Sequence, residues 1–277
     1  MNVIKALYIL GVPTSTLRDI YDGPRASPPQ GEGAGGRVDA QIMDARKHDD
    51  ALILFSRLPI GRETKTRLAP LLDEAQREGL HRAMWADVFA AASELEARAD
   101  LFLYWTGGGD VMEYRELIPP AFRLREQEGD SFGERMARAL GDAFEAGYSR
   151  ALLMGTDVPG VAPAHLRRAF DALSASDLVL GPSLDGGYWL VGMSRLIPEV
   201  FDLPPRAAWG GAGVLSATLE RARGLGVAYE LADTLLDLDA PEDVEAFLSG
   251  PASWGRHTRS FLFDAAASRV TRTFCAR

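Results

Sequence analysis

Residues 151–160 of the chain read ALLMGTDVPG, and this stretch decides the fold. The apolar run from Ala151 to Met154, ended by Gly155, is typical of a buried strand in a parallel sheet. Such sheets bind ligands at the carboxyl ends of their strands, where Asp157 would lie. Its carboxylate oxygens suit Mg²⁺ or Mn²⁺, which can bridge to phosphate oxygens. The alternative is that Asp157 serves only in a turn or a helix cap.

Strand-like and helix-like segments alternate on both sides of this stretch. The predicted strands cover residues 51–56, 101–105, 122–126, 151–155, 177–181, 188–192 and 227–231. The predicted helices cover residues 73–98, 131–147, 163–173, 213–223 and 241–248. This alternation predicts a single α/β domain over residues 51–250, with a mostly parallel sheet and helices on both faces.

The two ends of the chain carry weaker signals. Residues 1–50 include a stretch that is rich in Gly and Pro and poor in large apolar residues, so we expect a flexible lead-in. Met43 precedes a charged spacer, and we expect the native product to begin there. Residues 251–277 are expected to form a C-terminal tail.

Composition limits the class of protein. With 47% hydrophobic and 25% charged residues, the 277-residue chain has ordinary globular composition. The formal net charge of -9 argues against a nucleic-acid partner. The single cysteine, Cys275, excludes a disulfide or a Cys-based metal site within one chain. No apolar run reaches the length of a membrane span, so we expect a cytoplasmic protein. The oligomeric state stays open.

A basic loop follows the first predicted strand. Residues 57–67 read RLPIGRETKTR, a loop with four cations that also contains a Pro and a Gly. Backbone N–H groups of such a loop can wrap phosphates, with Lys65 and Arg67 as charge partners. The alternative is a solvated basic loop. The spacing of a P-loop is absent.

An acidic pair precedes the last predicted helix. Residues 236–243 read LDLDAPED, and Asp237 and Asp239 point to one side if the segment is extended. They can complete a metal site with Asp157. The alternative is that they cap the helix.

Two further segments follow predicted strands. In residues 181–188, GPSLDGGY, Gly186 and Gly187 allow a ligand to approach the backbone beside Asp185. Asp-Gly is also a strong hairpin-turn signal. In residues 127–136, QEGDSFGERM, the amide of Gln127 can donate and accept, as base recognition requires. Ser131 and the Glu three residues later alternatively form a capping box.

The order of these motifs resembles the bacterial type-A glycosyltransferase-like family of the nucleotide-diphosphosugar transferase superfamily. Some members are assigned to arsenosugar biosynthesis, and molybdopterin and phospholactate guanylyltransferases are related. The resemblance covers roughly residues 51–250. It rests on LF at 54–55, KTRL at 65–68, GD at 129–130, GERM at 133–136, GTD at 155–157 with PG at 159–160, GP at 181–182, DGGY at 185–188, Trp209, and DLD at 237–239 with PED at 241–243.

The resemblance implies a role for each matching position. It implies catalytic roles for Lys65, Arg67, Asp157 and Asp185. It implies nucleotide contacts from Arg57, Gln127, Gly129, Asp130 and Thr156. It implies substrate contacts from Gly186, Gly187, Tyr188 and Trp209, and metal ligation by Asp157, Asp237 and Asp239.

These roles lead to three functional hypotheses. The first is metal-dependent transfer of a sugar from a nucleotide-diphosphosugar to a small-molecule acceptor. The alternative is nucleotidyl transfer from a nucleoside triphosphate, with release of pyrophosphate. A third hypothesis is a non-catalytic nucleotide-binding protein. The first two need the same Mg²⁺ or Mn²⁺ ion and the same cations, so the sequence separates them poorly.

Overall fold

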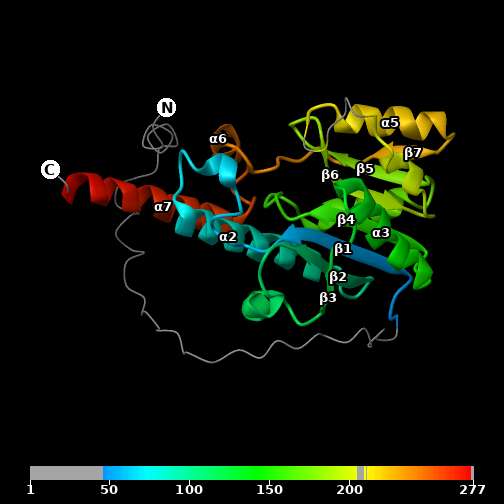
Figure 1. Ribbon diagram of the computed structural model, residues 1–277, viewed down its shortest axis with the longest axis horizontal. Coiled ribbons are helices and arrows are strands. Elements are labelled where there is room, and N and C mark those ends of the chain that lie inside the picture. Colours follow the sequence, from blue (N-terminus) through cyan, green and yellow to red (C-terminus); the bar gives the residue numbers. More distant parts are fainter. Residues whose placement is uncertain (1–45, 205–208, 210, 276–277) are drawn as a thin grey trace. The chain divides into compact units, whose positions relative to one another are not determined.

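The computed structural model describes residues 46–204, 209 and 211–275, with side chains described as far as residue 267 (Figure 1). The expected native start at Met43 and most of the expected lead-in lie outside the described residues. Within them, no helix has both the length and the apolar character needed to cross a membrane.

Seven strands form one sheet in the order β3-β2-β1-β4-β6-β5-β7. They are β1 Asp50–Arg57, β2 Ala99–Thr106, β3 Phe122–Glu126, β4 Arg150–Gly155, β5 Leu178–Pro182, β6 Tyr188–Met193 and β7 Tyr229–Leu231. All neighbouring pairs are parallel except those of β6, which runs antiparallel to both β4 and β5. The predicted α/β fold with a mostly parallel sheet is confirmed.

Helices cover both faces of the sheet (Figure 1). They are α2 Glu74–Ser93, α3 Phe132–Glu145, α4 Pro163–Ala172, α5 Val214–Gly224, α6 Pro241–Ser249 and α7 Arg256–Cys275. Short 3-10 helices occur at η1 Thr66–Leu68, η2 Val111–Leu117 and η3 Pro198–Phe201.

The alternation of side chains along β1 explains why a hydrophobic core lies on each face of the sheet. Ala51, Ile53 and Phe55 belong to a core with residues of α3 and α5. Leu52 and Leu54 belong to a second core with residues of α2 and α4. Because successive side chains of a strand point to opposite faces, the apolar run 51–55 of one strand serves both cores.

Residues 251–277, expected as a tail, contain the long helix α7, which lies beside α2 (Figure 1). The buried carboxylate of Asp87 on α2 accepts hydrogen bonds from the backbone N–H of His257 (2.9 Å) and of Thr258 (2.8 Å), and from the Thr258 hydroxyl (2.7 Å). The first N–H groups of α7 therefore find their acceptor on another helix. No local capping signal marks this helix in the sequence.

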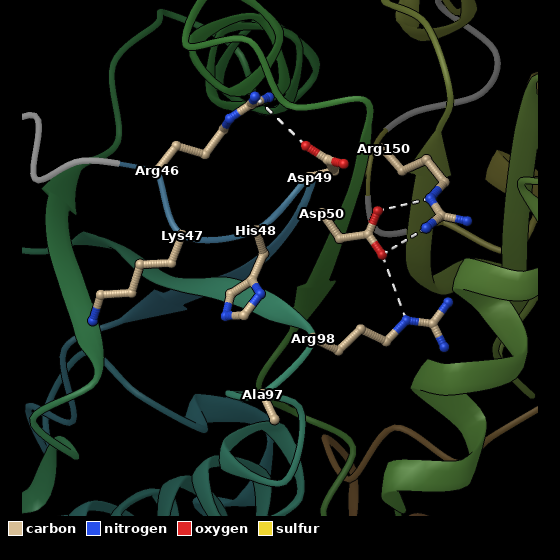
Figure 2. Close-up of a pocket in the computed structure, with 8 residues that line it drawn as sticks. All are labelled: Arg46, Lys47, His48, Asp49, Asp50, Ala97, Arg98 and Arg150. Carbon is tan, nitrogen blue, oxygen red and sulfur yellow. Dashed lines mark hydrogen bonds and ion pairs between the residues drawn. The ribbon is translucent and has the colours of Figure 1, made fainter.

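The amino ends of the strands carry a cavity of about 540 Å³ (Figure 2). Asp50, which is buried, accepts from Arg150 Nε at 2.7 Å and Nη2 at 2.9 Å, and Arg98 Nε lies 3.5 Å away. Two guanidinium groups thus neutralise one buried carboxylate. We interpret this cluster as structural, since it lies at the edge opposite to the one where parallel sheets bind ligands.

Candidate functional site

A second cavity of about 560 Å³ lies at the carboxyl ends of β1 and β4. It brings together Arg57, Lys65, Arg67, Gln127, Thr156, Asp157, Asp185, Gly187, Tyr188, Trp209, Asp237 and Asp239. Of the predicted site residues, Gly129, Asp130 and Gly186 do not line it. The edge of the sheet therefore gathers residues from six separate segments of the chain.

Lys65 connects three of these segments. Its side chain is only 2% exposed, and its ammonium group lies 2.6 Å from Asp157 Oδ1 and 3.7 Å from Asp239 Oδ1. It also donates a hydrogen bond of 2.8 Å to the carbonyl of Leu238. The backbone N–H of Leu238 in turn donates to the carbonyl of Asp157 at 2.8 Å. Lys65 is therefore a buried, fixed cation rather than a residue of a solvated loop.

The remaining cations of the pocket differ in their partners. Arg67 Nη1 donates to Asp239 Oδ2 at 3.1 Å. Arg57 and Arg135 also line the pocket, and neither forms an ion pair among the residues that the structure describes. Arg135 lies with its guanidinium carbon 5.7 Å from the ring centre of Phe132. Arg135 is not among the site residues predicted from the sequence, although it lies within the GERM motif.

The carboxylates of Asp157, Asp185 and Asp237 repel one another across the pocket. Burial, followed by the charges of Asp157 and Asp185, raises the pKa of Asp237 to about 7. Burial has the largest single effect on the pKa of Asp157 and acts to raise it, but the charge and hydrogen bond of Lys65, together with His81 and Arg57, hold that pKa below its ordinary value. An added cation would relieve the repulsion between Asp157 and Asp237.

The carboxylate oxygens of the pocket fit a divalent ion that is bound jointly by the protein and a substrate. Among the described residues, no group of three or more His, Cys, Asp and Glu side chains is arranged to hold a metal. Mg²⁺ is usually bound through one or two carboxylates together with substrate phosphates, so a pair is sufficient. Of the three predicted ligands, Asp157 and Asp237 would supply that pair, and the oxygens of Asp239 lie beside Lys65 and Arg67. The assignment of metal ligands stays a prediction.

Two predicted nucleotide contacts already have partners inside the protein. The side-chain nitrogen of Gln127 donates to the carbonyls of Ser56 (3.2 Å) and Tyr104 (2.9 Å), at the ends of β1 and β2. Only its side-chain oxygen is left for a ligand. The buried hydroxyl of Thr156 lies 2.7 Å from that of Ser56. Both side chains therefore help to build the floor of the pocket.

Gly129 and Asp130 belong to the start of α3. The backbone N–H groups of Asp130 and Ser131 donate to Glu134 Oε2 at 2.9 and 3.1 Å, and Glu134 N donates to the Ser131 hydroxyl at 3.1 Å. The alternative capping box is thus present. Gly129 has a φ of 135°, a conformation that side chains rarely adopt.

The segment 183–187 forms the hairpin turn between β5 and β6, as the alternative interpretation of its Asp-Gly signal expects. Asp185 Oδ1 accepts from the Ser183 hydroxyl (2.5 Å) and from the backbone N–H of Gly187 (3.0 Å). A Cβ on Gly186 would lie 2.3 Å from the carbonyl oxygen of Ala212. The turn still places Asp185 in the pocket wall.

Aromatic rings close the pocket beside this turn. Trp209 packs edge-on against Phe132 at 5.5 Å and against Tyr188 at 6.3 Å, measured between ring centres. This arrangement is compatible with the predicted role of Trp209 as a wall of the acceptor cleft.

Comparison with known proteins gives consistent matches. Residues 89–208 match the family described as "Uncharacterized protein conserved in bacteria (DUF2064)". A 2-phospho-L-lactate guanylyltransferase of Methanothermobacter thermautotrophicus is 30% identical over 210 residues, which are 74% of this chain and 87% of the relative. A 3-phospho-D-glycerate guanylyltransferase of Phenylobacterium zucineum is 30% identical over 207 residues, 74% and 92% of the two chains.

One solved structure is similar over most of the domain. It is a putative nucleotide-diphospho-sugar transferase from Desulfovibrio desulfuricans G20, with a TM-score of 0.72 and 28% identity over 79% of this chain and 96% of that one. These similarities support the status of the chain as a transferase that binds nucleotides. The chain belongs to the DUF2064 family, which is related to the 2-phospho-L-lactate and 3-phospho-D-glycerate guanylyltransferases.

Proposed function

We propose that this chain transfers a nucleoside monophosphate from a nucleoside triphosphate, first of all GTP, to the phosphate of a small phosphorylated carboxylic acid. The observation that carries the proposal is the composition of the pocket in a chain related to two guanylyltransferases. Four cations (Arg57, Lys65, Arg67 and Arg135) line the same 560 Å³ cavity as the carboxylates of Asp157 and Asp237. Such a cavity suits two anionic substrates that must meet.

The proposed reaction exchanges one phosphoanhydride bond for another. An oxygen of the acceptor phosphate attacks the α-phosphorus of GTP. The bond between the α-phosphorus and the oxygen bridging to the β-phosphate breaks, and pyrophosphate leaves. The product contains a new diphosphate linkage between the acceptor and the nucleoside. Catalysis of such a step consists mainly of positioning and charge stabilisation.

Each group of residues has a part in this step. Asp157 and Asp237 would hold Mg²⁺ or Mn²⁺, and a bound ion supplies neutralising charge to the phosphate oxygens. Lys65 fixes the orientation of the Asp157 carboxylate through their 2.6 Å contact. Arg57 and Arg135 are available to phosphate or carboxylate oxygens of the substrates. Tyr188 and Trp209, with the 183–187 turn, bound the side on which we place the acceptor.

Sugar transfer is the second candidate. The motif resemblance favours it, and the similar Desulfovibrio structure is named as a putative nucleotide-diphospho-sugar transferase. The two guanylyltransferase relatives support nucleotidyl transfer instead. The two reactions differ in their leaving group, which is a nucleoside diphosphate in sugar transfer and pyrophosphate in nucleotidyl transfer.

The leaving group therefore provides the test. The full chain is incubated with Mn²⁺ or Mg²⁺ and each nucleoside triphosphate, together with 2-phospholactate or 3-phosphoglycerate. Parallel reactions contain UDP-sugars or GDP-sugars with the same acceptors. Pyrophosphate and a nucleotide-linked acceptor, identified by mass spectrometry, are the expected products. Release of a nucleoside diphosphate from a sugar donor would establish sugar transfer. Nucleotide binding without any turnover would favour the non-catalytic hypothesis.

A further inference from the structure

A buried polar network forms part of the lining of the pocket, through Ser56, Thr64, His81 and Thr156. His81 on α2 is 3% exposed, and its Nδ1 lies 2.6 Å from the hydroxyl of Thr64. Its Nε2 lies 3.4 Å from the hydroxyl of Ser56 at the end of β1. The Ser56 hydroxyl also accepts a hydrogen bond from Trp85 Nε1 at 2.8 Å and lies 2.7 Å from the hydroxyl of Thr156. All five side chains are buried.

The network ends next to the two most important charges of the site. Thr64 immediately precedes Lys65, and Thr156 immediately precedes Asp157. Each charged residue therefore follows a threonine whose side chain is fixed to the same His81–Ser56 pair. The network fixes the backbone on both sides of the 2.6 Å contact between Lys65 and Asp157.

The backbone of Lys65 needs such support. Its φ is 49°, and it is the one residue other than glycine with positive φ among those that the structure describes. A side chain in this conformation strains the backbone and persists only where the surroundings hold it. Buried Arg77, also on α2, binds the carbonyls of Gly61 (2.9 Å) and Thr64 (3.2 Å). Helix α2 thus holds the strained loop through two side chains.

We propose that His81 is a positioning residue that sets Lys65 against Asp157 through Thr64 and the Ser56–Thr156 pair. This role rests on the proposed function only for its catalytic consequence, because the contacts themselves are independent of the reaction.

The charge state of His81 agrees with this role. Burial, helped by the nearby charge of Lys65, lowers the pKa of His81 to about 4 although Asp157 acts in the opposite direction. The imidazole is neutral at pH 7, so it places no second positive charge beside Lys65. A neutral imidazole can donate from one nitrogen and accept at the other, which satisfies hydroxyl groups on two sides.

Four variants separate this role from a general effect on stability. His81→Leu removes both polar contacts, whereas His81→Asn keeps a polar atom near the position of Nδ1 and thus the contact with Thr64. Thr64→Val removes the same contact from the other side with little change of shape. Val88→Ala is the matched control, because Val88 is buried on the same helix but belongs to the core with α4 and β3.

The first measurement is hydrogen–deuterium exchange of peptides that cover residues 60–68. We expect faster exchange in His81→Leu and Thr64→Val, near wild-type exchange in His81→Asn, and no change in Val88→Ala. This measurement needs no substrate. Unchanged exchange in His81→Leu and Thr64→Val would overturn the proposal even if the chain had another activity.

The second measurement is turnover of GTP and acceptor. We expect kcat/KM to fall on the order of 10- to 100-fold in His81→Leu, because small displacements of charged groups are costly in catalysis. His81→Asn should recover most of the activity. If His81→Leu loses no more activity than Val88→Ala, the positioning role is wrong. If the wild type itself shows no turnover, the proposed function fails while the exchange data still decide the role of His81.

Discussion

The ammonium group of Lys65 and the carboxylate of Asp157 meet at 2.6 Å although they follow different strands. Lys65 lies in the loop after β1, and Asp157 lies just beyond the end of β4. These strands are parallel neighbours in a register that pairs Phe55 with Gly155. The pairing brings the carboxyl ends of the two strands together, and the loop after β1 then carries Lys65 to Asp157. The site depends on this register. Substitutions of single residues therefore test its carboxylates and cations separately, as long as the strands stay paired.

Asp157→Asn keeps the shape of the side chain and removes its charge. We expect the Mn²⁺-dependent gain in nucleotide affinity to disappear. We expect a stability loss of only about 1–2 kcal/mol, because Lys65 keeps the carbonyl of Leu238 as an acceptor. Calorimetric titration of GTP with Mn²⁺ and with EDTA measures the affinity, and urea unfolding measures the stability. Asp171→Asn, which changes an exposed ion pair with Arg98, is the control. A full Mn²⁺ effect in Asp157→Asn would remove this residue from the metal site.

Metal binding should depend on pH around neutrality. Since the pKa of Asp237 is raised to about 7, protons compete with the metal below that pH, and apparent Mn²⁺ affinity should fall as pH drops from 8 to 6. The stability of the metal-free protein should instead increase as the pH drops. The folded state holds this proton more tightly than the unfolded state, so the contribution is present at low pH and is lost as pH rises through about 7.

Comparison with Asp237→Asn tests both trends. The variant should show weak Mn²⁺ binding at every pH, and its stability should lack the decrease between pH 6 and 8. Electron paramagnetic resonance of free Mn²⁺ and urea unfolding at each pH provide the data. A wild-type Mn²⁺ affinity that is constant from pH 6 to 8 would contradict the role assigned to Asp237.

Asp50→Asn should destabilise the fold and leave the chemistry intact. The carboxylate is buried and binds Arg150 through two hydrogen bonds, so its loss leaves partly buried guanidinium groups without their counter-charge. We expect a loss of about 2–4 kcal/mol in the free energy of unfolding. KM for nucleotide should not change, since the pair lies at the other edge of the sheet. Asp233→Asn, in an exposed pair with Arg168, should cost less than about 1 kcal/mol. An equal loss in the free energy of unfolding for the two variants would show that the buried ion pair stabilises the fold no more than the exposed one.

Asp87→Ala tests whether α7 depends on α2 for its first turn. The change leaves two backbone N–H groups and the Thr258 hydroxyl without their acceptor, so we expect a loss of about 2–3 kcal/mol. Thr258→Val removes one of the three bonds and should cost about 1 kcal/mol. Urea unfolding followed by circular dichroism gives both values. The prediction is wrong if the two substitutions are equally costly.

The sequence predicted the strands around Asp157 well because their signals are local. An apolar run that ends in Gly155 defines β4, and Asp73 and Ser131 mark the starts of α2 and α3 through their capping boxes. The edge that gathers the charged residues then follows from the rule for parallel sheets. These features need no information from distant parts of the chain.

The partners of Gln127 and His81 could not be predicted in the same way. Gln127 binds carbonyls of two different strands, 71 and 23 residues away in sequence. His81 is a lone histidine in a helix, and its contacts lie 17 and 25 residues away in sequence. The same holds for α7, whose capping residue, Asp87, is about 170 positions upstream. Long-range contacts of this kind leave no pattern in a single sequence.

The reversed direction of β6 has a consequence for how this site can diversify. An antiparallel strand presents its amino end, Tyr188, at the edge where β4 presents its carboxyl end. The turn at residues 183–187 therefore joins two strands within the wall of the pocket, and neither strand carries Lys65 or Asp157. Hairpin turns tolerate changes of length and sequence better than the strands that they connect. With the acceptor bound beside this turn, as we propose, a change in a single turn would alter the choice of acceptor, while the residues assigned to the nucleotide stay as they are.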